Sequence, residues 1–158
     1  MKRVALRLLA ALVLCTAFIA FSSCRKGVVY SEFIAISSGE WDENALPEFD
    51  FNITDNRAGY DILLYVRHTE RYPYQNMWLF VRGYPQQYRD TIEFYLADDR
   101  GRWLGDKHHG FIEMPVLLET NYHFPDTGRF YFAIQHGMRD SVLRGVTDVG
   151  IEIVKSEE

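Results

Sequence analysis

Short runs of alternating apolar and polar residues recur along the chain. In residues 129–136, the apolar side chains of Phe130, Phe132 and Ile134 take alternate positions. The same alternation recurs in three further runs, 49–54, 91–96 and 149–154. Because successive strand residues point to opposite faces, this period of two predicts β-strands that each bury one face in a core.

Other apolar runs predict strands in different sheet positions. Residues 60–66 and 77–81 are apolar on both faces, which predicts central strands. Residues 27–36 are rich in β-branched and aromatic side chains and predict an edge strand. In residues 111–118, Pro115 cannot donate a ladder hydrogen bond, so we expect this strand at a sheet edge or a bulge.

Two connecting segments carry expectations of their own. Residues 37–47 read as a loop, with Trp41 inserted into the core. Residues 137–145 are expected to form one or two helical turns around Val142 and Leu143, ending at Gly145.

The succession of short strands and turns predicts an all-β protein. We expect a single antiparallel β-sandwich of about eight strands, immunoglobulin-like or a related Greek key, with one short helical turn. The spacing Asp126-x-Gly128-x-Phe130-x-Phe132 resembles the corner before strand F of immunoglobulin-like sandwiches. Phe130 replaces the usual tyrosine and Phe132 the usual cysteine, so the likeness supports a Greek-key arch rather than true immunoglobulin topology. The predicted core consists of the inward strand residues Phe49, Phe51, Ile62, Leu64, Leu79, Ile92, Phe94, Leu96, Phe130, Phe132, Ile134, Val149, Ile151 and Ile153.

The N-terminal segment has the pattern of a secretory signal peptide. Three basic residues precede the apolar run 8–21, which is shorter than the roughly 20 residues that span a bilayer. The run ends in Ser22-Ser23-Cys24, which resembles a bacterial lipobox, although Phe21 departs from the usual leucine. We therefore expect cleavage after residue 23 and diacylglycerol on Cys24, with several acyl chains as a stable anchor. An uncleaved anchor and an ordinary secreted protein are the alternatives.

These patterns divide the chain into three parts. Residues 1–23 form the signal peptide, 24–36 the lipidated N-terminus with the first strand, and 37–158 the β-sandwich domain.

Processing changes the charge and the cysteine chemistry of the chain. Of 17 Lys and Arg, three lie in the signal peptide, which has no acidic residue, so 14 remain against 22 Asp and Glu. The resulting net charge of −8, with histidine neutral, opposes binding to nucleic acid or to an anionic lipid surface. Cys15 leaves with the signal peptide and Cys24 is acylated, so we expect no disulfide, thiolate nucleophile or cysteine metal site.

The histidines do not form a recognisable metal-binding pattern. His108 and His109 follow Asp106, with His123 and His136 further along the chain, and imidazoles and a carboxylate could bind zinc. However, adjacent strand residues point to opposite faces, and no His-x-His or HExxH motif occurs. We interpret these histidines as solvated turn residues.

The sequence also lacks a recognisable catalytic centre. Asp98-Asp99 precedes Arg100-Gly101, which is typical of a turn, and a glycosidase pair would need a separation that sequence cannot show. No serine stands in a G-x-S-x-G elbow, and no glycine-rich phosphate loop occurs. We expect no enzyme activity, no metal and no cofactor.

Aromatic residues make up 15% of the chain. Tyr72, Tyr74, Tyr84 and Tyr88 stand in predicted loops, where exposed rings could anchor protein partners or stack on sugars. The alternative is that these tyrosines fill the ends of a sandwich.

Several long stretches carry a family resemblance. They are YPYQNMWLF (72–80), DTIEFYLADDRGRWLG (90–105), FPDTG (124–128), QHGMRD (135–140) and LRGVTDVG (143–150). With the lipobox, they resemble the gliding-motility lipoprotein family, GldH type, of Bacteroidota. The resemblance implies an outer-membrane lipoprotein associated with gliding and the type IX secretion apparatus. The family has no established reaction, and homologues in species that do not glide leave secretion or envelope assembly open as the common role.

The favoured function is therefore a non-enzymatic assembly or scaffold component. Its expected partners are the membrane, through the anchor at Cys24, and other envelope proteins of the gliding and secretion apparatus. Arg25-Lys26-Gly27 contains no acidic run like the surface-export signal of Bacteroidota lipoproteins, so we expect the domain to face the periplasm. The alternative is a carbohydrate- or peptidoglycan-binding β-sandwich lipoprotein.

The predicted docking surface combines aromatic side chains and charged side chains from two loops. Its anchors are Tyr72, Tyr74, Asp98, Asp99, Arg100, Arg102 and Trp103. The alternative is that Trp103 belongs to the core and the charges form an ordinary turn.

Overall fold

The computed structural model describes residues 27–85 and 87–157. The signal peptide and Cys24 lie outside the described residues. The strands are β1 (Val28–Ala35), β2 (Glu40–Asp42), β3 (Glu48–Ile53), β4 (Tyr60–His68), β5 (Asn76–Tyr84), β6 (Tyr88–Tyr95), β7 (Asp106–Lys107), β8 (Ile112–Tyr122), β9 (Gly128–His136), β10 (Val142–Arg144) and β11 (Val146–Lys155). A single 3-10 turn, η1 (Ser37–Gly39), accompanies them in the described part.

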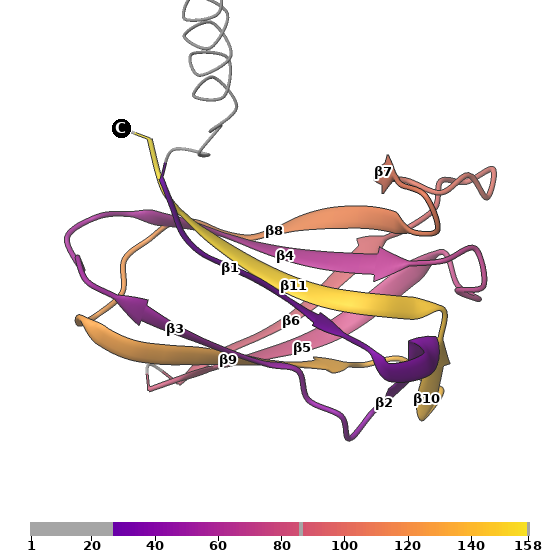
Figure 1. Cartoon of the computed structure of the whole chain (residues 1–158), viewed down its shortest axis with the longest axis horizontal. Coiled ribbons are helices and arrows are strands. Elements are labelled where there is room, and N and C mark those ends of the chain that lie inside the picture. The colour runs from indigo at the N-terminus through magenta and orange to yellow at the C-terminus, as the bar shows by residue number, and fades with distance from the viewer. Residues whose placement is uncertain (1–26, 86, 158) are drawn as a thin grey trace, which may run out of the picture.

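Two antiparallel sheets are stacked as the layers of a sandwich (Figure 1). One sheet has the strand order β1-β11-β4-β8-β7, and the other has the order β3-β9-β5-β6. A separate two-stranded ladder joins β10 to β2. The predicted antiparallel β-sandwich is therefore confirmed, and eight of the described strands have six or more residues.

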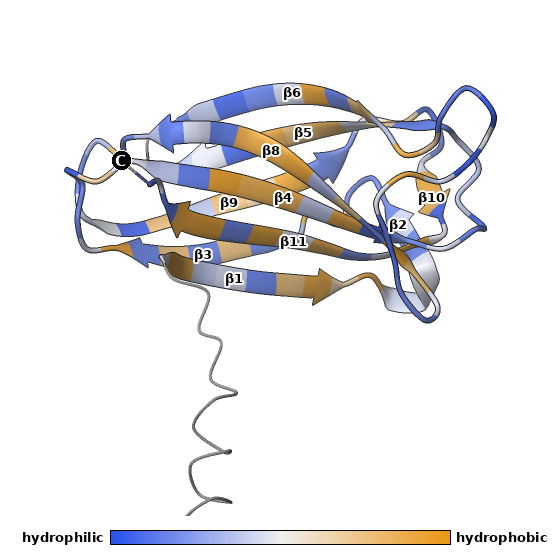
Figure 2. Cartoon of the chain, turned by 90° about the horizontal axis from the view of Figure 1, so that it is seen from above, coloured by the Kyte–Doolittle hydropathy of each residue, from blue (hydrophilic) through white to orange (hydrophobic). Residues whose placement is uncertain are grey.

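The apolar side of each long strand faces the space between the sheets. Figure 2 shows alternating apolar and polar positions on strands such as β3, in which Phe49, Phe51 and Ile53 are buried and the residues between them are exposed. Every residue of the predicted core is buried except Ile92, which is half-buried. The strand period alone thus identified the inward face correctly.

The predicted strand positions hold in most cases. β1 lies at an edge, and β4 lies between β11 and β8 in the middle of its sheet. β8 pairs irregularly with β4. On its outer side β8 pairs only with the two-residue strand β7, so most of β8 forms the other edge of the sheet. Prolines and bulges suit such an edge because they discourage pairing with a further chain.

The helical turn predicted for residues 137–145 is wrong. Residues 142–144 form β10, which pairs with β2 so that Leu143 lies opposite Trp41. Both side chains are fully buried, so this short ladder closes one end of the core. Trp41 is inserted into the core as predicted, but from a strand rather than a loop.

The prediction that residues 77–81 form a central strand is confirmed, but the apolar outer face of this strand is not buried. β5 lies between β9 and β6, but only Met77, Leu79 and Val81 face the core. Trp78 and Phe80 point outward and are 38% and 37% exposed. No second layer covers this face in the described part of the chain.

The two ends of the sandwich differ in what they carry. β1 begins opposite Val154, and the Lys155 amide donates to the Gly27 carbonyl, so both described ends of the chain lie together (Figure 1). We call this the tether end. The loops 69–75, 96–105 and 137–141 lie at the opposite end, which we call the loop end. β4 runs between these ends and, at about 3.3 Å per residue, spans roughly 30 Å.

Candidate functional site

The two loops of the predicted docking surface do lie together. The amides of Leu96 and Ala97 donate to the Gln75 carbonyl at 2.6 and 3.1 Å. The rings of Tyr72 and Trp103 contact each other edge to face, with centroids 6.4 Å apart. Backbone and side-chain contacts therefore hold the loops 69–75 and 96–105 as one surface at the loop end.

Tyr72 is a correction to the predicted surface. Its side chain is only 3% exposed, and its hydroxyl donates to the Asn76 carbonyl at 2.7 Å. Burial also raises the pKa of Tyr72, because the phenolate would be poorly solvated. Tyr72 supports the loops from within and cannot serve as an exposed anchor.

Tyr74 remains at the surface and is half-buried. Its hydroxyl donates to the Asp140 carboxylate at 2.7 Å, which raises the pKa of Tyr74 because the phenolate would lose this bond and lie beside a negative charge. The contact ties the loop 69–75 to the loop 137–141. The ring is thus held in place while part of it remains accessible.

Asp98 organises the charged turn. Its carboxylate accepts the amides of Arg100 and Arg102, both at 2.9 Å, and the Arg102 guanidinium at 2.7 Å. These hydrogen bonds, led by the Arg102 amide, hold the pKa of Asp98 below its ordinary value. Asp98 is therefore used within the turn, as the simpler interpretation of this stretch expects.

The remaining charged groups of the turn face solvent. Asp99 and Arg100 are exposed, and the Arg102 side chain is 71% exposed although it is paired with Asp98. Trp103 is half-buried and contacts His68 edge to face at 4.8 Å. The accessible residues of the docking surface are therefore Tyr74, Asp99, Arg100 and Arg102. Trp103 lies beside them and is half-buried.

Two histidines are buried in the sandwich, which corrects the interpretation of His136 as a solvated turn residue. His136 is 2% exposed, and its Nε2 donates to the Trp41 carbonyl at 3.1 Å. His68 is fully buried, and its Nδ1 donates to the Thr69 carbonyl at 3.1 Å. In each ring the other nitrogen is buried without a partner, which suits a neutral imidazole because an unprotonated nitrogen carries no N–H. Burial lowers the pKa of both histidines.

The other sequence candidates for metal binding do not meet. His108, His109, His123 and Asp106 are exposed, and His108 stacks on Phe111 with centroids 4.9 Å apart. Across residues 27–85 and 87–157, no group of three or more His, Cys, Asp or Glu could hold a metal ion. No helix in that same part is long and apolar enough to cross a membrane.

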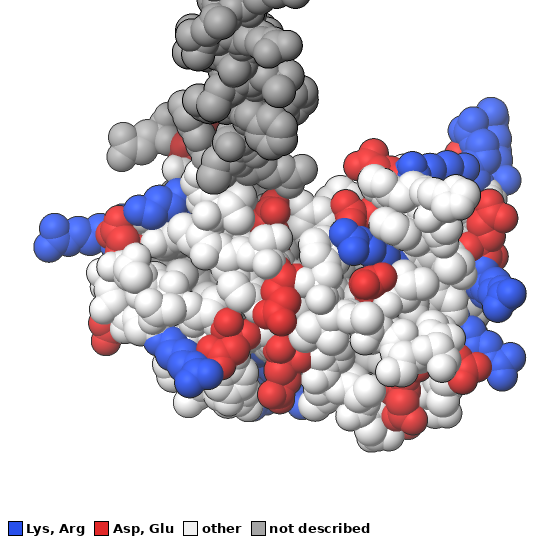
Figure 3. Space-filling view, viewed as in Figure 1, with Lys and Arg blue, Asp and Glu red and all other residues white. Residues whose placement is uncertain are grey.

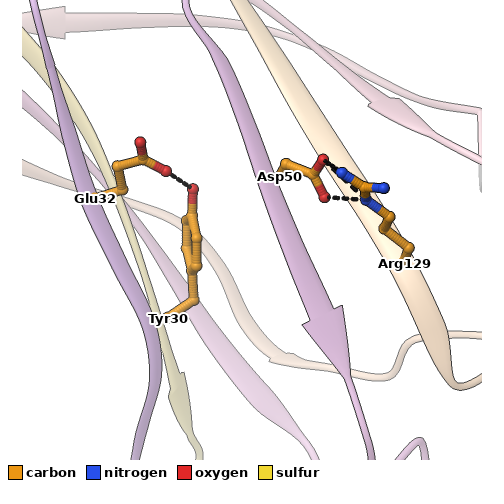
Figure 4. A network of polar contacts seen from close by, with 4 residues as sticks. All are labelled: Tyr30, Glu32, Asp50 and Arg129. Atoms are coloured by element: carbon orange, nitrogen blue, oxygen red, sulfur yellow. Dashed lines mark hydrogen bonds and ion pairs between the residues drawn. The ribbon is translucent and has the colours of Figure 1, made fainter.

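Two separate polar contacts lie near the tether end, on the side where the edge strands β1 and β3 face each other (Figure 4). The Tyr30 ring packs on Phe51 at 5.4 Å, and its hydroxyl donates to Glu32. Asp50 on β3 accepts hydrogen bonds from the Nε and Nη2 atoms of Arg129 on β9, which hold the pKa of Asp50 below its ordinary value. Each polar contact lies within one sheet, and the contact between Tyr30 and Phe51 joins the two sheets, so we assign these residues a structural role.

A narrow band of acidic side chains crosses this same side of the molecule (Figure 3). The exposed carboxylates on β1 and β3 are Glu32, Glu48 and Asp50. Such a band disfavours contact with an anionic surface or nucleic acid.

Sequence reasoning missed the outward face of the sheet β3-β9-β5-β6. Trp78 and Phe80 on β5, Tyr95 on β6 and Tyr131 on β9 are all exposed there. The sequence signal was that 77–81 is apolar at every position, which we interpreted as a central strand without asking whether its outer face is covered. Periodicity cannot distinguish a covered face from an exposed one.

The fold and surface define an antiparallel β-sandwich protein with a charged loop end and exposed aromatic rings on the outward face of one sheet. The chain belongs to the GldH lipoprotein family, which it matches over residues 28–153. It is 33% identical over 149 residues to the gliding motility lipoprotein GldH homolog of Christiangramia forsetii, covering 88% of this chain and 91% of the relative. It is 26% identical over 157 residues to the gliding motility lipoprotein GldH of Flavobacterium johnsoniae, covering 92% and 96% of the two chains.

Among solved structures, one similarity is to dimeric latent PorU from Porphyromonas gingivalis. It covers 85% of this chain and 14% of that chain, with 6% identity and a TM-score of 0.39. A score this low carries no weight for either fold or function.

Proposed function

We propose that this protein is a non-enzymatic component of the gliding-motility apparatus, anchored to the outer membrane and facing the periplasm. The anchor is the diacylglycerol expected on Cys24, and the domain docks on other envelope proteins of the gliding and type IX secretion machinery. Membership of the GldH lipoprotein family and the gliding-motility names of two relatives support this role.

The observation that carries the docking proposal is the arrangement of the two ends. The described chain starts at Gly27, beside the C-terminal strand, so an anchor at Cys24 lies three residues from the tether end. The half-buried Tyr74 and the exposed Arg100 and Arg102 belong to the loops 69–75 and 96–105 at the loop end, across the length of the sandwich (Figure 1). An anchored domain thus presents its loop end away from its attachment point, where a partner can reach it.

The loop end also has the properties of a prepared interface. Tyr74 and Arg102 are both held by carboxylates, Asp140 and Asp98, so little side-chain freedom remains to be lost on binding. Tyrosine and arginine are the residues most often found to dominate interface energy. Buried Tyr72 fixes the backbone that follows Tyr74, because its hydroxyl donates to the Asn76 carbonyl.

The test is a pull-down from detergent-solubilised outer membrane with the double variant Tyr74→Ala, Arg102→Ala. We expect the variant to fold and to reach the membrane but to lose its protein partners, because both side chains act at the surface. Arg57→Ala is the matched control, since Arg57 is an exposed arginine at the tether end. If the double variant retains its partners while Arg57→Ala loses them, docking occurs at the tether end and the proposal fails.

A further inference from the structure

A row of exposed aromatic rings lies on the outward face of the sheet β3-β9-β5-β6. We call it the aromatic strip, and it consists of Trp78, Phe80 and Tyr84 on β5, Tyr131 on β9 and Tyr95 on β6. These side chains are between 37% and 58% exposed. Alternate residues on one strand stand about 6.7 Å apart, so the rings follow β5 in a line. The five rings lie on strands rather than in the docking loops, although the hollow at the end of the strip shares Tyr74 with the docking surface. The function of the strip does not depend on the proposal above.

The rings are positioned by the residues beneath and beside them. Tyr84 pairs with Tyr131 across the β5–β9 ladder, and their rings stack at 5.1 Å with an angle of 22°. A Cβ atom at Gly137 would come within 2.9 Å of the Phe80 ring, so this glycine provides the space in which the ring lies. The strip is therefore in place before any ligand arrives.

Planar polar groups stand between and beside the rings. Arg82, between Phe80 and Tyr84, donates to the Gln135 amide oxygen at 3.3 Å. Asn76 donates to the Glu93 carboxylate at 2.6 Å across the β5–β6 ladder. Flat aromatic rings therefore alternate along the strip with hydrogen-bonding groups. These groups include the positively charged Arg82 and the negatively charged Glu93, so the strip has no strong net charge.

A shallow hollow opens at the loop end of the strip. It is lined by Tyr74, Asn76, Trp78, Gly137, Met138 and Arg139. The Met138 sulfur accepts the Trp78 amide at 3.3 Å, which fixes the thioether against the strand. The hollow therefore combines an apolar wall, made by a ring and a thioether, with the amide of Asn76.

This chemistry fits a sugar chain better than the apolar centre of a protein interface. Acidic residues are depleted at interface centres, whereas Glu93 stands opposite Trp78 in the β5–β6 ladder, beside the strip. A pyranose has an apolar C–H face that can lie on an aromatic ring, and hydroxyl groups that bond to amide, guanidinium and carboxylate groups. An acetamido group would place its methyl on Met138 and Trp78 and its amide near Asn76.

We propose that the aromatic strip binds the glycan strand of the cell wall, a neutral polymer of N-acetylated amino sugars. The rings carry successive sugar faces along β5, and the hollow at Trp78 receives an acetamido group. The neutral glycan backbone also suits a chain whose mature charge of −8 would repel an anionic polysaccharide.

The test is titration of the full chain, purified in detergent micelles, with a hexamer of N-acetylglucosamine. Trp78 is exposed, whereas Trp41 is fully buried and Trp103 half-buried, so binding should shift tryptophan emission to shorter wavelength through Trp78. Trp78→Phe should retain binding, measured by calorimetry, but lose the spectral shift. Trp78→Ala combined with Phe80→Ala should weaken binding by about tenfold or more, because two stacking surfaces are removed.

The matched control is Leu117→Ala, which removes an apolar side chain that is 60% exposed on the other sheet. Leu117→Ala should leave the affinity for the hexamer unchanged. Sedimentation with purified peptidoglycan sacculi should rank the variants by affinity in the same order as the hexamer titration. Absence of saturable binding to both hexamer and sacculi would overturn the proposal. Binding of the Trp78→Ala, Phe80→Ala variant with the affinity of the wild type would also overturn it. Capture of a protein rather than a glycan through Trp78 would overturn it as well.

Discussion

At the scale of single residues, position relative to the core decides what each aromatic side chain does. Phe132 and Tyr131 are neighbours on β9, yet Phe132 is fully buried and Tyr131 is 39% exposed. Phe132 contacts Phe51 on β3 at 5.4 Å and Tyr88 on β6 at 5.7 Å, so its buried ring contacts both edge strands of its sheet. Tyr131 contacts the exposed Tyr84.

Phe132→Ala should therefore lower the free energy of unfolding by about 3–5 kcal/mol, because it leaves a cavity in the core. Tyr131→Ala removes only a cross-strand contact and should cost about 1 kcal/mol or less. Urea denaturation of the purified full chain measures both. Equal losses for the two variants would contradict the assignment of inward and outward faces.

The buried histidines predict a pH dependence of stability. Burial lowers the pKa of His68 and His136 in the folded chain, so the unfolded chain binds more protons as pH falls below the ordinary value of 6.5. The two neutral, buried histidines make their full contribution to stability above about pH 6.5. This contribution is lost as the pH falls from 6.5 toward the lower pKa values that the histidines have in the folded chain. The slope is at most about 1.4 kcal/mol per pH unit for each histidine.

Urea denaturation between pH 7 and pH 5 tests this dependence. Replacing both histidines with glutamine should flatten the slope, whereas His123→Gln should leave it unchanged because His123 is exposed. A slope that survives the double replacement would assign the effect to other groups.

At the scale of elements, long strands could be predicted from the sequence and short ones could not. The run 129–136 shows its period over eight residues, whereas β2 and β10 have three residues each and no period to detect. Their pairing depends on contact between Trp41 and Leu143, which are far apart in sequence. The docking loops were predicted to meet and do meet, but the burial of Tyr72 depends on tertiary packing that local sequence does not encode.

The ladder between β2 and β10 depends on the turn at Gly145. Gly145 has φ of 84°, and a Cβ atom there would lie 2.5 Å from the Tyr72 amide nitrogen. Gly101 has a similar φ of 74° but has no atom within 4 Å of such a Cβ. Gly101→Ala should therefore cost only backbone strain of about 1–2 kcal/mol, and Gly145→Ala should cost clearly more. Comparable losses in urea denaturation would show that the Tyr72 backbone moves aside without difficulty.

At the scale of the whole molecule, we propose that the tether end attaches the domain to the membrane and the loop end binds its protein partner. The anchor proposal predicts that Cys24→Ala abolishes labelling by radioactive fatty acid and releases the protein from the membrane fraction. Cys15→Ala is the control, because Cys15 lies within the segment expected to be removed. Equal labelling of wild type and Cys24→Ala would contradict the anchor.

The central claim is that the anchored domain meets its protein partner at the loop end. The most direct measurement is site-specific photo-cross-linking in intact cells, with the photoreactive residue at position 100 or, for comparison, at position 57. Arg100 and Arg57 are both exposed arginines, at the loop end and the tether end respectively. We expect a discrete adduct with another envelope protein from position 100 and none of that size from position 57. An adduct from position 57 alone would contradict it.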